Sequence, residues 1–135
     1  MNRSLVILCA VLGFTGVAFG AFGAHGLKTS LEGLSDGAQR LAWWETGSRY
    51  HLWHALAVGL AAAVSGQVRS PLPRVAAYFF LAGIVLFSGS LYVMGLTGIR
   101  SLGLITPFGG FAMLLGWAFL ALAGRRLATA TAPSA

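Results

Sequence analysis

At Leu5–Ala24 the chain reads LVILCAVLGFTGVAFGAFGA, an uninterrupted run without a charged side chain. A helix rises about 1.5 Å per residue and a bilayer core is about 30 Å thick, so about 17–25 apolar residues suffice to cross it. Similar charge-free windows follow at Tyr50–Gly66, Val75–Leu96 and Pro107–Gly124. The four windows predict four transmembrane helices. The first run continues past the small residues near Ala18, which favours a membrane anchor over a cleaved signal peptide.

The composition excludes an ordinary soluble domain. Of the 135 residues, 57% are hydrophobic and only 9% are charged, whereas soluble domains carry about 25% charged residues. An unusually apolar soluble bundle is the alternative, but four long charge-free windows do not fit a hydrated exterior. We therefore predict an all-α integral membrane four-helix bundle, with residues 1–135 forming a single transmembrane domain whose spans cover about 5–24, 50–66, 75–96 and 107–124.

The net charge of +6 does not indicate nucleic-acid binding, because the basic residues form no single patch. They lie at the ends of the apolar windows, where they contact lipid headgroups and set orientation. One side would carry Arg3, Arg69, Arg74, Arg125 and Arg126, and the other Lys28, Arg40, Arg49 and Arg100. Arg69 and Arg74 flank the short second loop, and Arg125 and Arg126 follow the last span. These two pairs predict that both termini are cytoplasmic.

The stretch His25–Arg49 is the longest outside the windows. Gly26 is typical of the residue just after a helix, and Asp36 with Gln39 fits a helix N-cap and its capping partner. No proline follows until Pro71, so we predict one helix from about Gly37 to Gly66. Its first part is expected to be an interfacial helix that leads into the second span, with Trp43, Trp44, Tyr50 and Trp53 at headgroup depth.

The last connection and the third window contain most of the hydroxyl groups expected at depth. Threonine followed by proline is a helix-start signal, so Thr106 and Pro107 predict the start of the fourth span. Residues 97–106 would then form a glycine-containing loop. Ser88, Ser90, Tyr92 and Thr106 are predicted intramembrane hydroxyls that bond within a helix or to a neighbour. A substrate contact is the alternative.

Small residues follow two helical stripes that predict close helix packing. Spacings of three and four residues place them on one face of each helix, and small residues let backbones approach in lipid. The first stripe is Gly13, Gly16, Gly20 and Gly23, and the second is Ala55, Gly59 and Ala63.

Three histidines and three charged residues form a candidate polar cluster: His25, His51, His54, Glu45, Arg49 and Arg100. Imidazole binds metals and haem, so one interpretation is a metal or haem site where the first two spans meet the same membrane face. The other interpretation is hydrogen bonding to helix ends and interfacial packing. Glu45 and Arg49 stand four residues apart on a helix, and two interpretations fit them: an ion gate, or an ion pair whose charges neutralise each other. The sequence contains no recognisable catalytic motif, and we assign it no catalytic residue, metal or cofactor.

Several blocks taken together resemble a known family. They are GAFGAHGL at Gly20–Leu27, RYH at Arg49–His51 with HAL at His54–Leu56, FSGSLY at Phe87–Tyr92, and ITPFGG at Ile105–Gly110 with Gly116-Trp117. In this order they resemble the YgdD-type family of small inner-membrane proteins, a family of unknown function with eukaryotic relatives. The likeness runs from Leu5 to Gly124. His51 departs from the glutamine common in that family, while His25 and His54 match. The resemblance implies a multi-span protein of the bacterial inner membrane and supplies no reaction or ligand.

Three functions follow from these patterns as hypotheses. The first is a non-enzymatic accessory or assembly subunit, with a membrane-protein partner or a homo-oligomer in the lipid bilayer. The second is a small-solute or ion pathway formed by an oligomer around the polar cluster. The third is a haem or metal site on the histidines.

Overall fold

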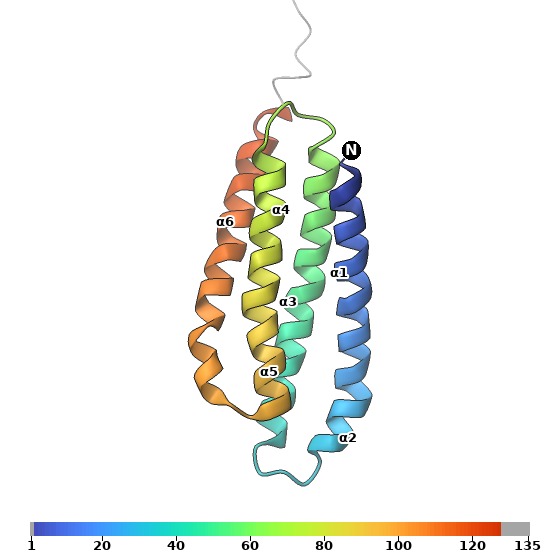
Figure 1. Ribbon diagram of the computed structural model, residues 1–135, viewed down its shortest axis with the longest axis vertical. Helices are drawn as coiled ribbons and strands as arrows, with labels where there is room; N and C mark the ends of the chain where they lie inside the picture. Colours follow the sequence, from blue (N-terminus) through green and yellow to red (C-terminus); the bar gives the residue numbers. More distant parts are fainter. Residues whose placement is uncertain (1, 128–135) are drawn as a thin grey trace, which may run out of the picture.

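The computed structural model describes residues 2–127, and every regular element in that part is helical (Figure 1). Helix α1 (Arg3–Phe22) continues through the π turn η1 (Gly23–Leu27) into α2 (Lys28–Leu31), and α3 is Gly37–Val64. Helix α4 (Leu72–Gly83) continues through the π turn η2 (Ile84–Ser88) into α5 (Gly89–Thr97), and the 3₁₀ turn η3 (Arg100–Leu104) precedes α6 (Thr106–Gly124). The all-α prediction is confirmed.

These elements form four long rods that run up and down side by side (Figure 1). The start of α1 and the end of α6 lie at one end of the molecule, and the α2–α3 loop and η3 lie at the other, which we call the loop end. Three rods are long and apolar enough to cross a membrane: Arg3–Leu31, Leu72–Thr97 and Arg100–Gly124. The α3 rod is not among them, because histidines and charged residues lower the apolarity of its first half.

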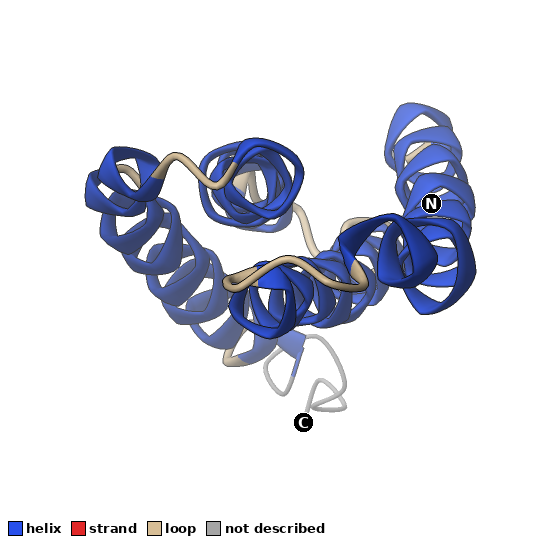
Figure 2. Cartoon of the chain, turned by 90° about the horizontal axis from the view of Figure 1, so that it is seen from below, coloured by secondary structure: helices blue, strands red, loops and turns tan. Residues whose placement is uncertain are grey.

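Seen end on, the rods follow an open curve (Figure 2). By their contacts, α1 and α6 are at the two ends of this curve, and α3 and the α4–α5 rod lie between them. Helix α3 packs against α1 on one side and against α4, η2 and α5 on another, whereas α6 packs mainly on α4 and η2. The main core lies where α3, α4 and α6 meet, and it includes Val58, Ala61, Ala76 and Phe80, all fully buried. Since α1 has its extensive contacts with α3, its opposite side faces away from the protein.

The first helix does not end near Gly26 as predicted. A π turn accommodates His25 and Gly26 within the rod, and the helix continues to Leu31. The chain then reverses at Gly33, whose φ of +84° requires the left-handed conformation that glycine adopts without steric cost. The first rod is therefore about two turns longer than its apolar window.

The long helix after the loop is continuous, from Gly37 to Val64, as predicted. Its first turns run alongside η1 and α2 in line with the rest of the rod, so they do not form a separate, differently directed segment (Figure 1). Asp36 occupies the N-cap position without a capping hydrogen bond. Its carboxylate lies 3.9 Å from the Arg40 guanidinium instead.

The connection before α6 is anchored by Arg40. Helix α5 ends at Thr97 and is capped by Gly98, which has a φ of +75°. Arg40 Nε donates to the carbonyl of Gly95 at 2.9 Å, and its terminal nitrogen donates to the carbonyl of Leu96. Helix α6 then begins at Thr106 with Pro107 in its first turn, although the Thr106 side chain makes no cap.

Candidate functional site

His51 joins three helices through both of its ring nitrogens. It lies on α3 and is 4% exposed. Its Nδ1 is 3.1 Å from the hydroxyl of Tyr92 on α5, and its Nε2 is 3.3 Å from the hydroxyl of Thr15 on α1. We call these three residues the His51 relay. It is one polar link between the edge helix α1 and the rest of the protein.

The direction of each hydrogen bond in the His51 relay follows from Thr15. Its hydroxyl hydrogen is directed at the carbonyls of Val11 and Leu12, at 3.0 and 3.1 Å, so its oxygen accepts from His51 Nε2–H. The Nδ1 of His51 then bears the lone pair and accepts from the Tyr92 hydroxyl. All three side chains therefore have hydrogen-bond partners while they are uncharged.

His54 is held in the opposite tautomer. Its Nδ1 lies 2.8 Å from the carbonyl of Tyr50, one turn back on α3, and a carbonyl can only accept. The indole N–H of Trp117 on α6 donates to His54 Nε2 at 3.3 Å. His54 is 5% exposed and also contacts the ring of Phe80 on α4. This histidine therefore links α3 to α6 and α4.

This pattern bears on the metal and haem interpretation, because a ligating imidazole needs a free nitrogen lone pair. On both buried histidines the lone pair accepts a hydrogen bond from Tyr92 or Trp117. No group of three metal-binding side chains occurs within residues 2–127. The geometry thus supports helix linkage as the role of these histidines.

His25 is not brought to the other two histidines, contrary to the depth argument from the sequence. A Cβ on Gly16 would lie 3.5 Å from the His51 ring, so these two residues share a level. His25 lies nine residues further along the rod, about 13 Å along a helix axis. It is exposed on η1 near the loop end. The first helix continues beyond the predicted end, which places His25 outside the cluster.

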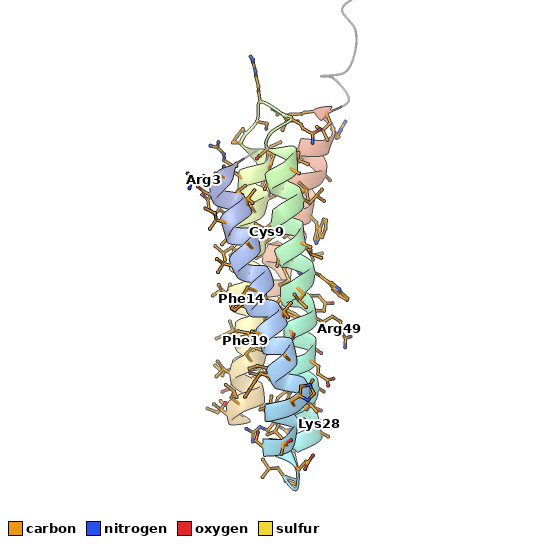
Figure 3. All side chains as sticks on the ribbon, turned by 90° about the vertical axis from the view of Figure 1, so that its right-hand side faces the viewer. Arg3, Cys9, Phe14, Phe19, Lys28 and Arg49 are labelled. Carbon is orange, nitrogen blue, oxygen red and sulfur yellow. The ribbon has the colours of Figure 1, made fainter. Side chains whose placement is uncertain are left out.

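The charged members of the predicted cluster lie apart from the buried histidines. Glu45 and Arg49 are exposed on the side of α3 that faces away from the core, and Arg100 is exposed on η3. Figure 3 shows Arg49 pointing away from the rods at the level of Phe19. Glu45 and Arg49 line a shallow hollow beside α1 with Gly20 and Ser48. One chain therefore does not assemble these groups into a polar ring.

The predicted hydroxyls differ in their partners. Ser90 donates to the carbonyl of Phe87 at 2.9 Å, and its oxygen lies 2.8 Å from that of Thr106, which ties α5 to α6. Tyr92 belongs to the His51 relay. Ser88 is fully buried in η2, and its hydroxyl has no hydrogen-bond partner among the described residues.

The two small-residue stripes lie partly at helix contacts. A Cβ on Gly16 would meet Leu52 at 2.8 Å, one on Gly20 would meet the Ser48 hydroxyl at 3.1 Å, and Gly23 lies directly against the Trp44 ring. Gly13 has open space instead. On α3, Gly59 faces Cys9 of α1, Ala55 is buried and Ala63 is exposed. These contacts bring α1 and α3 together over most of α1.

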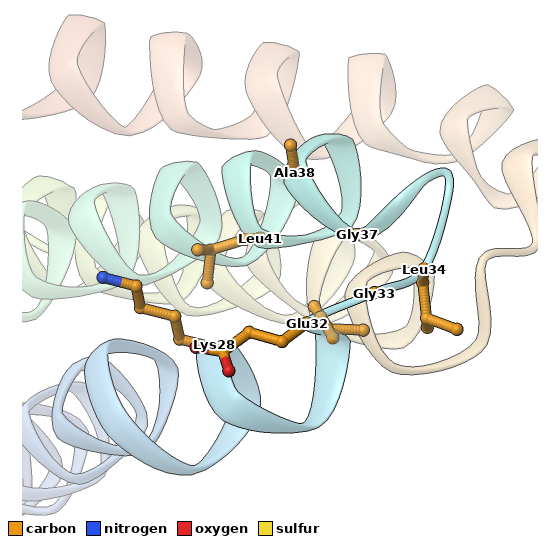
Figure 4. Close-up of a pocket in the computed structure, with 8 residues that line it drawn as sticks. Lys28, Glu32, Gly33, Leu34, Gly37, Ala38 and Leu41 are labelled. Atoms are coloured by element: carbon orange, nitrogen blue, oxygen red, sulfur yellow. The ribbon is translucent and has the colours of Figure 1, made fainter.

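A separate pocket of about 260 Å³ lies at the loop end, between α2 and the start of α3 (Figure 4). Lys28 and Glu32 line it on the α2 side, and Gly37 and Leu41 line it on the α3 side. None of the residues predicted from the sequence as candidate site residues lines this pocket. It is an open hollow between two helix ends, and it shares no residue with the histidines.

Trp44, which the sequence predicts at headgroup depth, is a buried core residue. It is 4% exposed, its indole N–H donates to the carbonyl of Phe19 at 2.8 Å, and its ring packs on Tyr92. Trp117 was not predicted as a partner of His54. The only signal available was its occurrence in a family block, because the contact joins residues 63 positions apart.

The chain is similar to membrane proteins of unknown function. The family described as "Protein of unknown function (DUF423)" matches residues 19–110. The UPF0382 membrane protein YwdK of Bacillus subtilis is 40% identical over 90% of this chain and 95% of its own length. The UPF0382 inner membrane protein YgdD of Escherichia coli K12 is 41% identical over 93% and 92%. A UPF0382 membrane protein of Haemophilus influenzae is 41% identical over 90% and 93%.

No solved structure matches the chain at a significant level. The names of the relatives describe membrane proteins and mention no reaction, in agreement with the apolar helices found here. The resemblance to the YgdD-type family is thereby confirmed, as is the membrane localisation. The chain belongs to the DUF423 family of membrane proteins of unknown function.

Proposed function

We propose that this protein is a non-enzymatic accessory or assembly subunit of a membrane complex. The observation that carries the proposal is that most of its buried polar side chains are hydrogen-bonded, with Ser88 as an exception among the described residues. His51, His54, Tyr92 and Ser90 all bond to neighbouring helices or to backbone. Such groups fix how the helices pack, and they leave no free nucleophile, base or metal ligand among them.

The outer face of α1 is the surface best suited to a partner. It presents Val6, Ile7, Val11, Phe14 and Val17, all exposed, and Phe14 is 77% exposed. Helix α1 is an edge helix, so a partner helix can pack along it without disturbing the other rods. Lipid covers this face when no partner is bound.

Purification from native membranes in a mild detergent tests this proposal. We expect a reproducible protein partner or a homo-oligomer, and loss of that association in Phe14→Ala. Phe111→Ala is the matched control, because Phe111 is 62% exposed on α6 and its loss should leave the association intact. A monomer that co-purifies with no other protein would contradict the proposal.

We further propose that all four rods cross the membrane as a four-helix bundle, including α3. The polar residues that lower the apolarity of α3 support this reading, because Ser48, His51 and His54 are buried against other helices and not directed toward lipid. Intramembrane polar groups favour such interior positions. The first turns of α3, before about residue 46, then extend from the bilayer at the interface beside α2.

Cysteine labelling tests the crossing of α3. In a Cys9→Ala background, Ala42→Cys and Leu56→Cys place thiols on two exposed positions of α3. A membrane-impermeant maleimide should label position 42 from one side of intact membranes and leave position 56 unlabelled. Equal labelling at both positions would show that α3 lies outside the bilayer.

We also propose that both termini face the cytoplasm. The end of the molecule where α1 starts and α6 ends carries Arg3, Arg69, Arg74, Arg125 and Arg126, five of the nine basic residues, and basic residues beside short loops stay cytoplasmic. An export-dependent reporter fused to the C-terminus should be inactive, and a cytoplasmic reporter should be active. The reverse result would invert the topology.

A further inference from the structure

A groove of about 380 Å³ opens between α3 and α6 toward the surroundings of the protein. Aromatic rings line much of it: Tyr50 and Trp53 on α3, and Trp117 on α6. Met113 and Leu114 complete its apolar wall, and Gly110 leaves room at the end nearer the loops. The two helices contact each other only sparsely, since both pack on the α4–α5 rod. The groove therefore results from the way α3 and α6 pack on the α4–α5 rod.

Arg49 lies next to this groove in sequence but does not line it, and it lines the hollow beside α1 instead. It directly precedes Tyr50 and stands one turn before Trp53, on the exposed side of α3. It has no hydrogen bond or ion pair with any described residue. Figure 3 shows its side chain directed away from the rods. The protein thus presents an unpaired cation on the exposed side of α3, one residue before Tyr50 of the apolar, aromatic groove.

We propose that this groove and Arg49 bind one anionic phospholipid from the leaflet at the loop end. The guanidinium would contact the phosphate, because arginine matches phosphate oxygens with two parallel donors. One acyl chain would lie along Tyr50, Trp53 and Trp117. The depth agrees with the proposed crossing of α3, on which this inference rests: Arg49 lies at the interfacial end of the span.

The dimensions of the groove suit an acyl chain. From Gly110 to Trp117 the groove follows seven residues of α6, about 10 Å along the helix. A volume of about 380 Å³ over that length leaves room for a slender chain. A slender chain enters without moving α3 and α6 apart.

Tryptophan quenching by brominated lipids tests the proposal, since two tryptophans line the groove. The full chain with Trp43→Phe is placed in phosphatidylcholine vesicles with brominated phosphatidylglycerol or, separately, brominated phosphatidylcholine. We expect the anionic lipid to be preferred by about fivefold, the factor that one basic residue near a charged membrane supplies. Arg49→Gln should remove the preference. Arg100→Gln, another exposed arginine at the loop end, should retain it.

Filling the groove tests the chain position separately. Gly110 lines the groove, and a Cβ there would make only an ordinary contact, 3.8 Å from the Phe87 ring, so we expect Gly110→Leu to fold and to narrow the groove. We expect it to reduce quenching by both brominated lipids. Gly13→Leu on α1, where a Cβ meets nothing within 4 Å, is the control. Its tryptophan fluorescence should be quenched as strongly as that of the parent.

Four results would overturn the proposal. Equal quenching by both lipids in the parent, or a preference that survives Arg49→Gln, would mean that Arg49 selects no lipid. Unchanged quenching in Gly110→Leu would place the chain elsewhere. A photo-crosslinker at position 53 that captures a protein, a second copy included, would make the groove a protein interface. The cysteine labelling described above tests the crossing of α3 independently of these results.

Discussion

Removing the Tyr92 hydroxyl should destabilise the protein by leaving the His51 Nδ1 lone pair without a donor. The 3.1 Å hydrogen bond is lost in Tyr92→Phe, and His51 is 4% exposed, so water has little access to replace it. A buried acceptor left unpaired costs about 1–3 kcal/mol, whereas measured side-chain hydrogen bonds within membranes average about 0.6 kcal/mol and reach about 1.7. We therefore expect a loss of about 1–2 kcal/mol in the free energy of unfolding.

A second substitution distinguishes this mechanism from lost packing. His51→Leu removes the acceptor and leaves the Tyr92 hydroxyl only its hydrogen bond with Ser48, while Thr15 retains its bonds to the carbonyls of Val11 and Leu12. The double variant leaves neither partner unpaired, so its loss should be smaller than the sum of the single losses by about 1 kcal/mol.

Reversible unfolding from dodecylmaltoside into SDS, followed by circular dichroism, measures all four proteins of this cycle. Tyr78→Phe is the control, because Tyr78 is 62% exposed on α4 and its hydroxyl should contribute within about 0.5 kcal/mol. If the losses at positions 51 and 92 add to within about 0.3 kcal/mol, the hydrogen bond between them does not contribute as described.

Two further substitutions test close packing and loop anchoring. Gly109→Ala should lower the free energy of unfolding by about 1–3 kcal/mol, because the new Cβ would overlap the backbone of Phe87. Gly89→Ala, where a Cβ meets open space, should be neutral or stabilising. Thermal unfolding in detergent compares the two variants, and equal stabilities would refute the contact. Arg40→Ala should speed amide hydrogen exchange over residues 96–105, because the guanidinium holds the carbonyls at the end of α5; unchanged exchange would contradict that role.

The helices could be predicted because the information for them is local. Each apolar window is long enough to cross a bilayer on its own, and Thr106-Pro107 marks a helix start without reference to any partner. The continuity of α3 followed from the absence of proline. The end of the first helix was missed because Gly26 was interpreted as a terminator, whereas a π turn accommodates it and the reversal occurs at Gly33.

The grouping of the histidines could not be predicted, because it depends on the register between α1 and α3. That register is set by contacts far apart in sequence: Gly16 with Leu52, Gly20 with Ser48, and Gly23 with Trp44. Glycine spacing shows which face of a helix is small, but it does not specify the residue it meets on the partner. The contact of His54 with Trp117 has the same origin, since α4 brings α6 against α3.

The polar residues of α3 also explain why the least apolar rod lies inside the fold. Ser48, His51 and His54 recur at intervals of three, so they share one side of the helix, opposite the exposed Arg49 and Trp53. A lipid-facing helix cannot satisfy such groups, because hydrocarbon supplies no hydrogen-bond partners. They are satisfied only if other helices surround that side, as α1, α5 and α6 do here. In this chain, low hydropathy together with polar residues on one helical side marks the central helix, and the more apolar rods cover it.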